Sequence, residues 1–113
     1  MQLAYSGAEV AGVVSFHGSL PPATDQQAEA VKARVLVEHG NDDAFIPAER
    51  IQKFKKALDT ANVDYRFNGY DGVRHAFTNP EAGSYGIPNL KYDAKADKKS
   101  WSNMKNFLAS IFK

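Results

Sequence analysis

The sequence contains no cysteine, no long apolar run and no excess of one charge. Without cysteine there is no disulfide framework, Cys-ligated zinc site, iron–sulfur cluster or thiol nucleophile. The longest apolar run, at residues 10–16, is far shorter than the roughly 20 residues that span a bilayer. The first residues carry neither the basic start nor the apolar stretch of a secretory signal. These absences predict a cytoplasmic protein with no membrane partner.

The charged residues are almost balanced in number. With 14 basic and 13 acidic side chains, the formal charge of +1 gives no electrostatic reason to expect a nucleic-acid partner. Residues 1–50 carry a net charge of −4 and residues 51–113 a net charge of +5, which we interpret as solvated helix faces. A length of 113 residues with 43% hydrophobic residues predicts a single small globular domain over residues 1–113.

Three short runs rich in β-branched and aromatic residues predict strands at residues 12–18, 34–40 and 63–70. The first two runs are nearly continuous in apolar residues, which is typical of strands buried on both faces of a parallel sheet. The third run alternates apolar and polar residues, which predicts an edge strand with one less covered face.

Helical patterns separate the predicted strands, at residues 47–61 and 97–112, and each has an apolar stripe that we expect in the core. The stripes are Ile51, Phe54, Leu58 and Ala61 in the first helix, and Trp101, Met104, Leu108 and Ile111 in the second. A helix end over residues 1–6, capped by Gly7, and a short helix over residues 26–32 complete the order. Alternating strands and helices predict an α/β fold with about three mainly parallel strands flanked by helices.

Titratable side chains follow the predicted strands at their carboxyl ends, where functional groups gather in parallel sheets. Asp42 and Asp43 follow the second strand, and His75 follows the third. A carboxylate bound to one nitrogen of an imidazole leaves the other nitrogen free to act as a general base. An Asp in such a loop is also typical of an Asx-turn or a helix N-cap, so the spacing alone leaves both interpretations open.

Two loops carry a resemblance to a known family. Residues 39–47, His-Gly-Asn-Asp-Asp-Ala-Phe-Ile-Pro, resemble the acid-bearing loop of the dienelactone hydrolase family, which has the α/β-hydrolase fold. Residues 72–80, Gly-Val-Arg-His-Ala-Phe-Thr-Asn-Pro, resemble its histidine loop, and the resemblance runs over essentially the whole chain. It implies a partial α/β-hydrolase-like layer, hydrolysis of a small carboxylic ester or lactone, Asp43 rather than Asp42 as the triad acid, and His75 as the triad base. We expect no cofactor.

One part of the family pattern is absent from the sequence. Family members carry Cys, or Ser in relatives, on a Gly-x-(Cys/Ser)-x-Gly elbow, and this sequence contains no cysteine and no Gly-x-Ser-x-Gly motif. We therefore expect a chain that resembles the C-terminal half of the family domain and is inactive alone. The alternative is a non-catalytic relative that serves as a binding or assembly module. Ser19 is a candidate substitute nucleophile, but its flank forms no elbow, so we expect a turn serine there and a structural role for Ser6.

Two further expectations concern a metal and a partner. Metal-ligand residue types lie near the strand ends, but their spacing matches no metal motif: His17, His39, Asp42, Asp43 and His75. We expect His17 and His39 to form hydrogen bonds within their strand-end turns, and no metal. In the family the first predicted strand would have a preceding neighbour, and residues 12–16 contain no proline or charge that would protect a free edge. We expect self-association, as a homodimer or a larger assembly, that hides this edge or exchanges the N-terminal helix between copies.

Overall fold

Three parallel strands form one sheet in the order β1-β2-β3. In this computed structural model, which describes residues 1–112, β1 is Gly12–Phe16, β2 is Arg34–Gly40 and β3 is Tyr65–Tyr70. In the register, Val14 of β1 lies opposite Leu36 of β2. Because all three strands run in one direction, their carboxyl ends meet at the same edge of the sheet.

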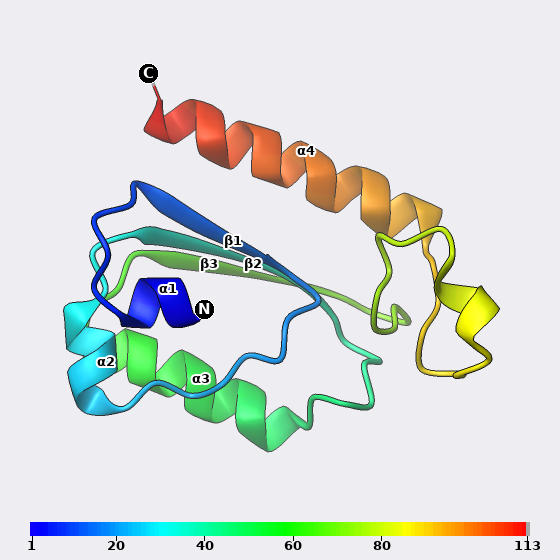
Figure 1. Ribbon diagram of the computed structural model, residues 1–113, viewed down its shortest axis with the longest axis horizontal. Helices are drawn as coiled ribbons and strands as arrows, with labels where there is room; N and C mark the ends of the chain where they lie inside the picture. Colours follow the sequence, from blue (N-terminus) through cyan, green and yellow to red (C-terminus); the bar gives the residue numbers. More distant parts are fainter. Residues whose placement is uncertain (113) are drawn as a thin grey trace.

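Helices cover both faces of the sheet (Figure 1). The short helices α1 (Gln2–Tyr5) and α2 (Asp25–Ala30) lie with α3 (Ala48–Thr60) on one face, and α4 (Ala94–Ile111) lies on the other. A 3-10 helix, η1 (Ala82–Tyr85), which the sequence did not predict, lies in the long connection between β3 and α4. The predicted α/β layer is therefore confirmed. Between residues 1 and 112, no helix has the length and apolar character needed to cross a membrane.

The helix boundaries follow from local sequence. Thr24 opens α2 with a capping box, in which Thr24 and Gln27 exchange side-chain-to-backbone hydrogen bonds. α3 begins directly after Pro47, where a missing backbone N–H costs nothing. α4 begins at Ala94 rather than at residue 97, because the Asp93 side chain accepts a hydrogen bond from the backbone N–H of Ala96.

The main hydrophobic core lies between the sheet and helices α1 to α3. Phe54 and Leu58 of α3 are completely buried, and they belong to one cluster with Val35 and Val37 of β2. Tyr5 of α1 joins this cluster while its hydroxyl donates to a backbone carbonyl 2.6 Å away. Burial of a large apolar side chain contributes roughly 1.5–3 kcal/mol, so the predicted stripe of α3 anchors this layer.

The apolar stripe of α4 is less buried than the sequence predicts. The apolar stripe of α4 is only partly buried, and Trp101 is 54% exposed; Ala96 and Ser100 are the buried side chains within the helix.

Every residue of β1 is half-buried, whereas β2 is buried from Val35 to Gly40. The apolar pattern correctly predicted a buried β2, but it was wrong for β1, because β1 is an edge strand with no outer neighbour among residues 1–112. β3 is the other edge strand, as predicted.

A polar network crosses the sheet beneath α4. Glu38 of β2 is completely buried and accepts hydrogen bonds from the Asn68 amide at 3.0 Å and from the Tyr70 hydroxyl. The Tyr70 oxygen in turn accepts a hydrogen bond of 3.0 Å from Asn103 of α4. Burial, together with the bond to Glu38, raises the pKa of Tyr70, so its phenol stays protonated and continues to donate. The network thereby satisfies both carboxylate oxygens and joins β2, β3 and α4.

Candidate active site

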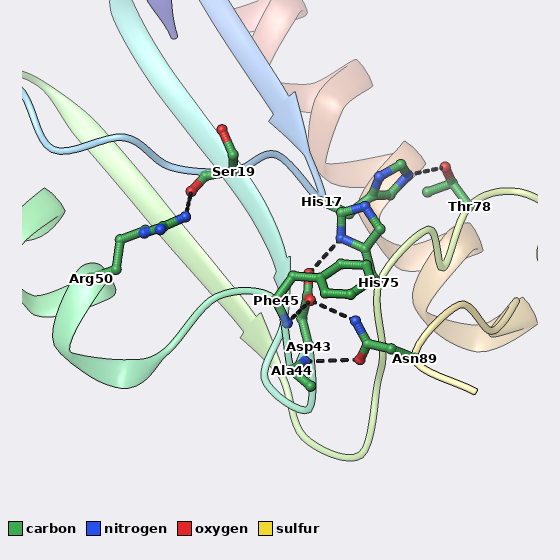
Figure 2. A network of polar contacts seen from close by, with 9 residues as sticks. All are labelled: His17, Ser19, Asp43, Ala44, Phe45, Arg50, His75, Thr78 and Asn89. Carbon is green, nitrogen blue, oxygen red and sulfur yellow. Dashed lines mark hydrogen bonds and ion pairs between the residues drawn. The ribbon is translucent and has the colours of Figure 1, made fainter. Parts of the chain in front are cut away.

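Asp43 and His75 meet at the carboxyl edge of the sheet (Figure 2). Asp43, which is 3% exposed, lies in the loop after β2, and its Oδ2 atom is 2.6 Å from Nδ1 of His75 in the loop after β3. An ionised carboxylate can only accept a hydrogen bond, so Nδ1 carries the proton. The neutral imidazole then has its free lone pair on Nε2, which is the arrangement of a general base and its orienting acid.

The second oxygen of the Asp43 carboxylate also accepts hydrogen bonds. Oδ1 accepts hydrogen bonds from the backbone N–H of Phe45 at 3.0 Å and from Nδ2 of Asn89 at 3.1 Å. The side-chain oxygen Oδ1 of Asn89 accepts a hydrogen bond from the backbone N–H of Ala44 at 2.8 Å, and this bond fixes the orientation of the Asn89 side-chain amide. Three donors therefore converge on one buried carboxylate. Asn89 was not predicted, since it lies in an irregular loop where no sequence pattern marks it.

The backbone around His75 is held by the same irregular loop. The N–H of His75 donates to the carbonyl of Asn89 at 3.0 Å, and the carbonyl of His75 accepts from the N–H of Lys91 at 3.1 Å. The Phe45 ring packs edge-on against the imidazole, with 5.2 Å between ring centroids. The side chain of His75 is nevertheless 25% exposed. The imidazole is therefore both ordered and accessible to a small molecule.

The other acid and the two serines that the sequence singled out do not join this pair. Asp42 is exposed, and its backbone N–H donates to the carbonyl of Val73. Ser19 is exposed and lies away from His75 (Figure 2), while its carbonyl accepts from Arg50 at 3.4 Å. The Ser6 hydroxyl donates to the carbonyl of Leu3 at the end of α1. Neither serine contacts the imidazole of His75.

The other two histidines differ from the prediction that each bonds within its own turn. His17 instead shares a hydrogen bond of 2.9 Å between its Nε2 atom and Oγ1 of Thr78, in the loop that carries His75. His39 is 1% exposed, and neither ring nitrogen has a hydrogen-bond partner within residues 1–112. Its side chain points onto the core face of the sheet, against the ring of Phe67, which offers no polar group. Burial lowers the pKa of both histidines, so both imidazoles are neutral at pH 7.

Among residues 1–112 no metal cluster lies at this site, and one cavity lies at the other end of the sheet. In the part of the chain that the structure describes, no three His, Asp or Glu side chains are arranged to hold a metal ion. A cavity of about 330 Å³ lies between α4 and the amino ends of β2 and β3, where Arg34, Tyr65 and Phe107 contribute to its lining. That cavity is at the opposite end of the strands from Asp43 and His75.

A sequence profile of the dienelactone hydrolase family matches residues 1–112. The chain belongs to the dienelactone hydrolase family. A solved structure described as a dienelactone hydrolase-like promiscuous phosphotriesterase from metagenomic libraries is similar over 97% of this chain and 46% of that chain, with 36% identity and a TM-score of 0.93. The solved structure m3DLH has 33% identity, the same coverages and the same TM-score.

A further member of the comparison is an uncharacterized protein of Caenorhabditis elegans, which is 30% identical over 104 residues, 91% of this chain and 66% of that protein. This dienelactone hydrolase family chain thus spans about half the length of its solved relatives. Within that half, its three parallel strands and flanking helices have the α/β-hydrolase fold of those relatives.

Proposed function

We propose that this chain carries the acid and base of a dienelactone hydrolase-like hydrolase that acts on carboxylic esters or lactones. The observation that carries the proposal is the 2.6 Å contact between Asp43 and Nδ1 of His75. In this reaction Nε2 of His75 takes the proton of the attacking group, and the Asp43 carboxylate stabilises the imidazolium that forms. Family membership supports the reaction class.

The sequence contains no cysteine and no Gly-x-Ser-x-Gly elbow to supply the family's nucleophile. In a well-studied serine protease, loss of the nucleophile lowers kcat about a millionfold. We therefore propose that the isolated chain is inactive in this reaction, and that Asp43 and His75 act in hydrolysis only where a nucleophile is supplied.

A chimaeric enzyme tests this role directly. The chain replaces the matched 46% of the metagenomic phosphotriesterase, whose remaining part is kept unchanged. We expect this chimaera to hydrolyse p-nitrophenyl acetate, and we expect His75→Ala to abolish the activity while Ser19→Ala leaves it unchanged. A folded, active chimaera that is indifferent to His75→Ala would contradict the assignment of the general base.

The isolated chain is assayed in parallel. We expect the wild type and His75→Ala to hydrolyse p-nitrophenyl acetate at the same low rate. A rate that falls more than about tenfold on His75→Ala would show that the chain is active alone, with His75 either activating a nucleophile or attacking the ester itself. Covalent labelling by a fluorophosphonate that is lost in Ser19→Ala would then identify Ser19 as that nucleophile.

A second function, as an assembly module, is favoured by the outer edge of β1. No strand among residues 1–112 pairs with this edge, and Gly12–Phe16 contains no proline or charged residue that would discourage pairing. We propose that a second copy of the chain covers this edge in a homodimer. Size-exclusion chromatography with light scattering should give twice the chain mass of 12.4 kDa. A well-folded monomer at millimolar concentration would contradict the proposal.

A further inference from the structure

His17 lies at the carboxyl end of β1, beside the histidine loop but outside the Asp43–His75 pair (Figure 2). Its backbone N–H extends the strand ladder by donating to the carbonyl of Glu38 at 2.9 Å. Its backbone φ of +39° is in the left-handed region, which costs a non-glycine residue on the order of 1 kcal/mol or more. Glycine would adopt this conformation without strain, so the backbone geometry gives no reason for a histidine at position 17. We therefore look to its imidazole for the contribution of this residue.

That imidazole forms two ring contacts and one hydrogen bond with the histidine loop. The ring lies edge-on to His75 and to Phe77, with 5.4 Å between centroids in each case. Its Nε2 atom shares the 2.9 Å hydrogen bond with the hydroxyl of Thr78. Ala76, which lies between the two contacted rings, also has a left-handed φ of +60°. Both segments that meet at this contact therefore contain a backbone position in the left-handed region.

The ring contacts of His75 restrict the rotation of its imidazole about the Cβ–Cγ bond, which the hydrogen bond to Asp43 alone does not fix. The χ2 torsion of histidine has broad minima, so a single hydrogen bond at Nδ1 does not fix the tilt of the ring. Phe45 packs against the imidazole at an interplanar angle of 65°, and His17 packs against it at 67°. Together the two rings limit rotation about the Cβ–Cγ bond and set the direction of Nε2, the atom that is to accept a proton.

We propose that His17 is a positioning residue for His75, which acts through its ring contact and through its hydrogen bond to Thr78. The proposal rests on the proposed role of His75 as a general base. Burial lowers the pKa of His17, with His75 as a further cause, so His17 remains neutral beside the imidazolium that His75 becomes during turnover. A neutral partner adds no charge repulsion to that step.

The experiment follows the Nδ1 proton of His75 by NMR in the complete 113-residue chain, labelled with 15N-histidine. A short hydrogen bond to a carboxylate shifts this proton downfield and slows its exchange with water. Thr78→Val removes the hydroxyl and keeps the side-chain shape, whereas Thr78→Ser keeps the hydroxyl. His17→Ala removes the ring. Ser110→Ala is the control, because it removes a hydroxyl whose 2.7 Å bond to a backbone carbonyl lies on α4, away from the site.

We expect Thr78→Val and His17→Ala to accelerate exchange of the His75 Nδ1 proton about tenfold or to abolish its resonance. Thr78→Ser and Ser110→Ala should leave the resonance unchanged. If His17→Ala fails to fold, Thr78→Val decides the question. Unchanged exchange in a folded Thr78→Val variant would overturn the proposal, as would a change explained entirely by lower global stability in urea.

The chimaera separates this inference from the proposed function. There we expect Thr78→Val to lower kcat while KM changes little, because the substituted residue orients the base and does not bind substrate. A folded but inactive chimaera, together with the predicted NMR response of the chain, would refute the hydrolase function and support the positioning role. An active chimaera whose kcat is unaffected by Thr78→Val would refute the positioning role alone.

Discussion

Asp43→Asn should reverse the tautomer of His75 without removing its side-chain partner. The carboxylate accepts three hydrogen bonds, from Nδ1 of His75 at Oδ2 and from Phe45 and Asn89 at Oδ1. An amide of the same shape has one oxygen and one NH₂ group, so it cannot accept at both positions. Either the hydrogen bond with His75 or the pair of hydrogen bonds with Phe45 and Asn89 must therefore change.

The hydrogen bond with His75 should be the one that changes, because one donor faces that position of residue 43 and two donors face the other. With the new NH₂ group toward Phe45 and Asn89, two donors face a donor, and Asn89 cannot invert without losing its bond to Ala44. With the NH₂ group toward His75, only one donor conflicts, and the imidazole relieves it by moving its proton to Nε2. Each unsatisfied buried donor costs about 1–3 kcal/mol, so the second arrangement is favoured by about 2 kcal/mol or more. Replacing charge-assisted bonds by neutral ones should lower the free energy of unfolding by about 2 kcal/mol.

The tautomer can be read from the 15N chemical shifts of the neutral imidazole, because a protonated and an unprotonated ring nitrogen differ in their shifts. We expect wild-type His75 to carry its proton on Nδ1, and the Asp43→Asn variant to carry it on Nε2, where it would block the base. Asp42→Asn, a substitution of the exposed neighbouring acid, is the control and should change neither the tautomer nor the stability. Retention of the Nδ1 proton in a folded Asp43→Asn variant would refute this account of the site.

Two further substitutions test buried groups outside the Asp43–His75 pair. Tyr70→Phe removes a donor to the completely buried Glu38 and should lower the free energy of unfolding in urea by about 1–3 kcal/mol; an unchanged midpoint would show that the carboxylate does not depend on it. His39→Leu should raise the free energy of unfolding by about 1 kcal/mol at pH 7, since it removes two ring nitrogens that lack partners within residues 1–112. Because burial holds the pKa of His39 below its ordinary value, the unfolded chain binds more protons below about pH 6.5, and stability falls as the pH drops through that range. Urea titrations between about pH 7 and pH 5 should therefore show a smaller loss for His39→Leu than for the wild type, and an equal loss would contradict the argument.

The sequence predicts the elements that local pattern controls. The strands and α3 follow from apolar periodicity, and Phe54 and Leu58 occupy the core as their spacing requires. Because parallel strands end at one edge, the positions of Asp43 and His75 along the chain already imply that they lie close together. Their separation of 32 residues would otherwise carry no such information.

What the sequence does not predict depends on tertiary contacts of irregular segments. Asn89 lies 46 residues from Asp43, and Thr78 lies 61 residues from His17, in loops without periodicity. The apolar stripe of α4 has the spacing of a core helix, yet Trp101 is more than half exposed. Burial depends on what covers a face as well as on the pattern of the face itself, and periodicity reports only the second.

The proposed positioning role of His17 predicts a link between the orientation of His75 and the outer edge of β1, which pairs with no strand among residues 1–112. β1 is half-buried throughout, and its ladder ends at the residue whose ring contacts His75. A strand added to the outer edge would restrain residues 12–16 and, through them, the strained backbone of His17. If a second copy supplies that strand, exchange of the His75 Nδ1 proton should slow as chain concentration rises through the dimerisation range measured by light scattering. Exchange that does not depend on concentration while the dimer forms would show that the edge and the site are independent.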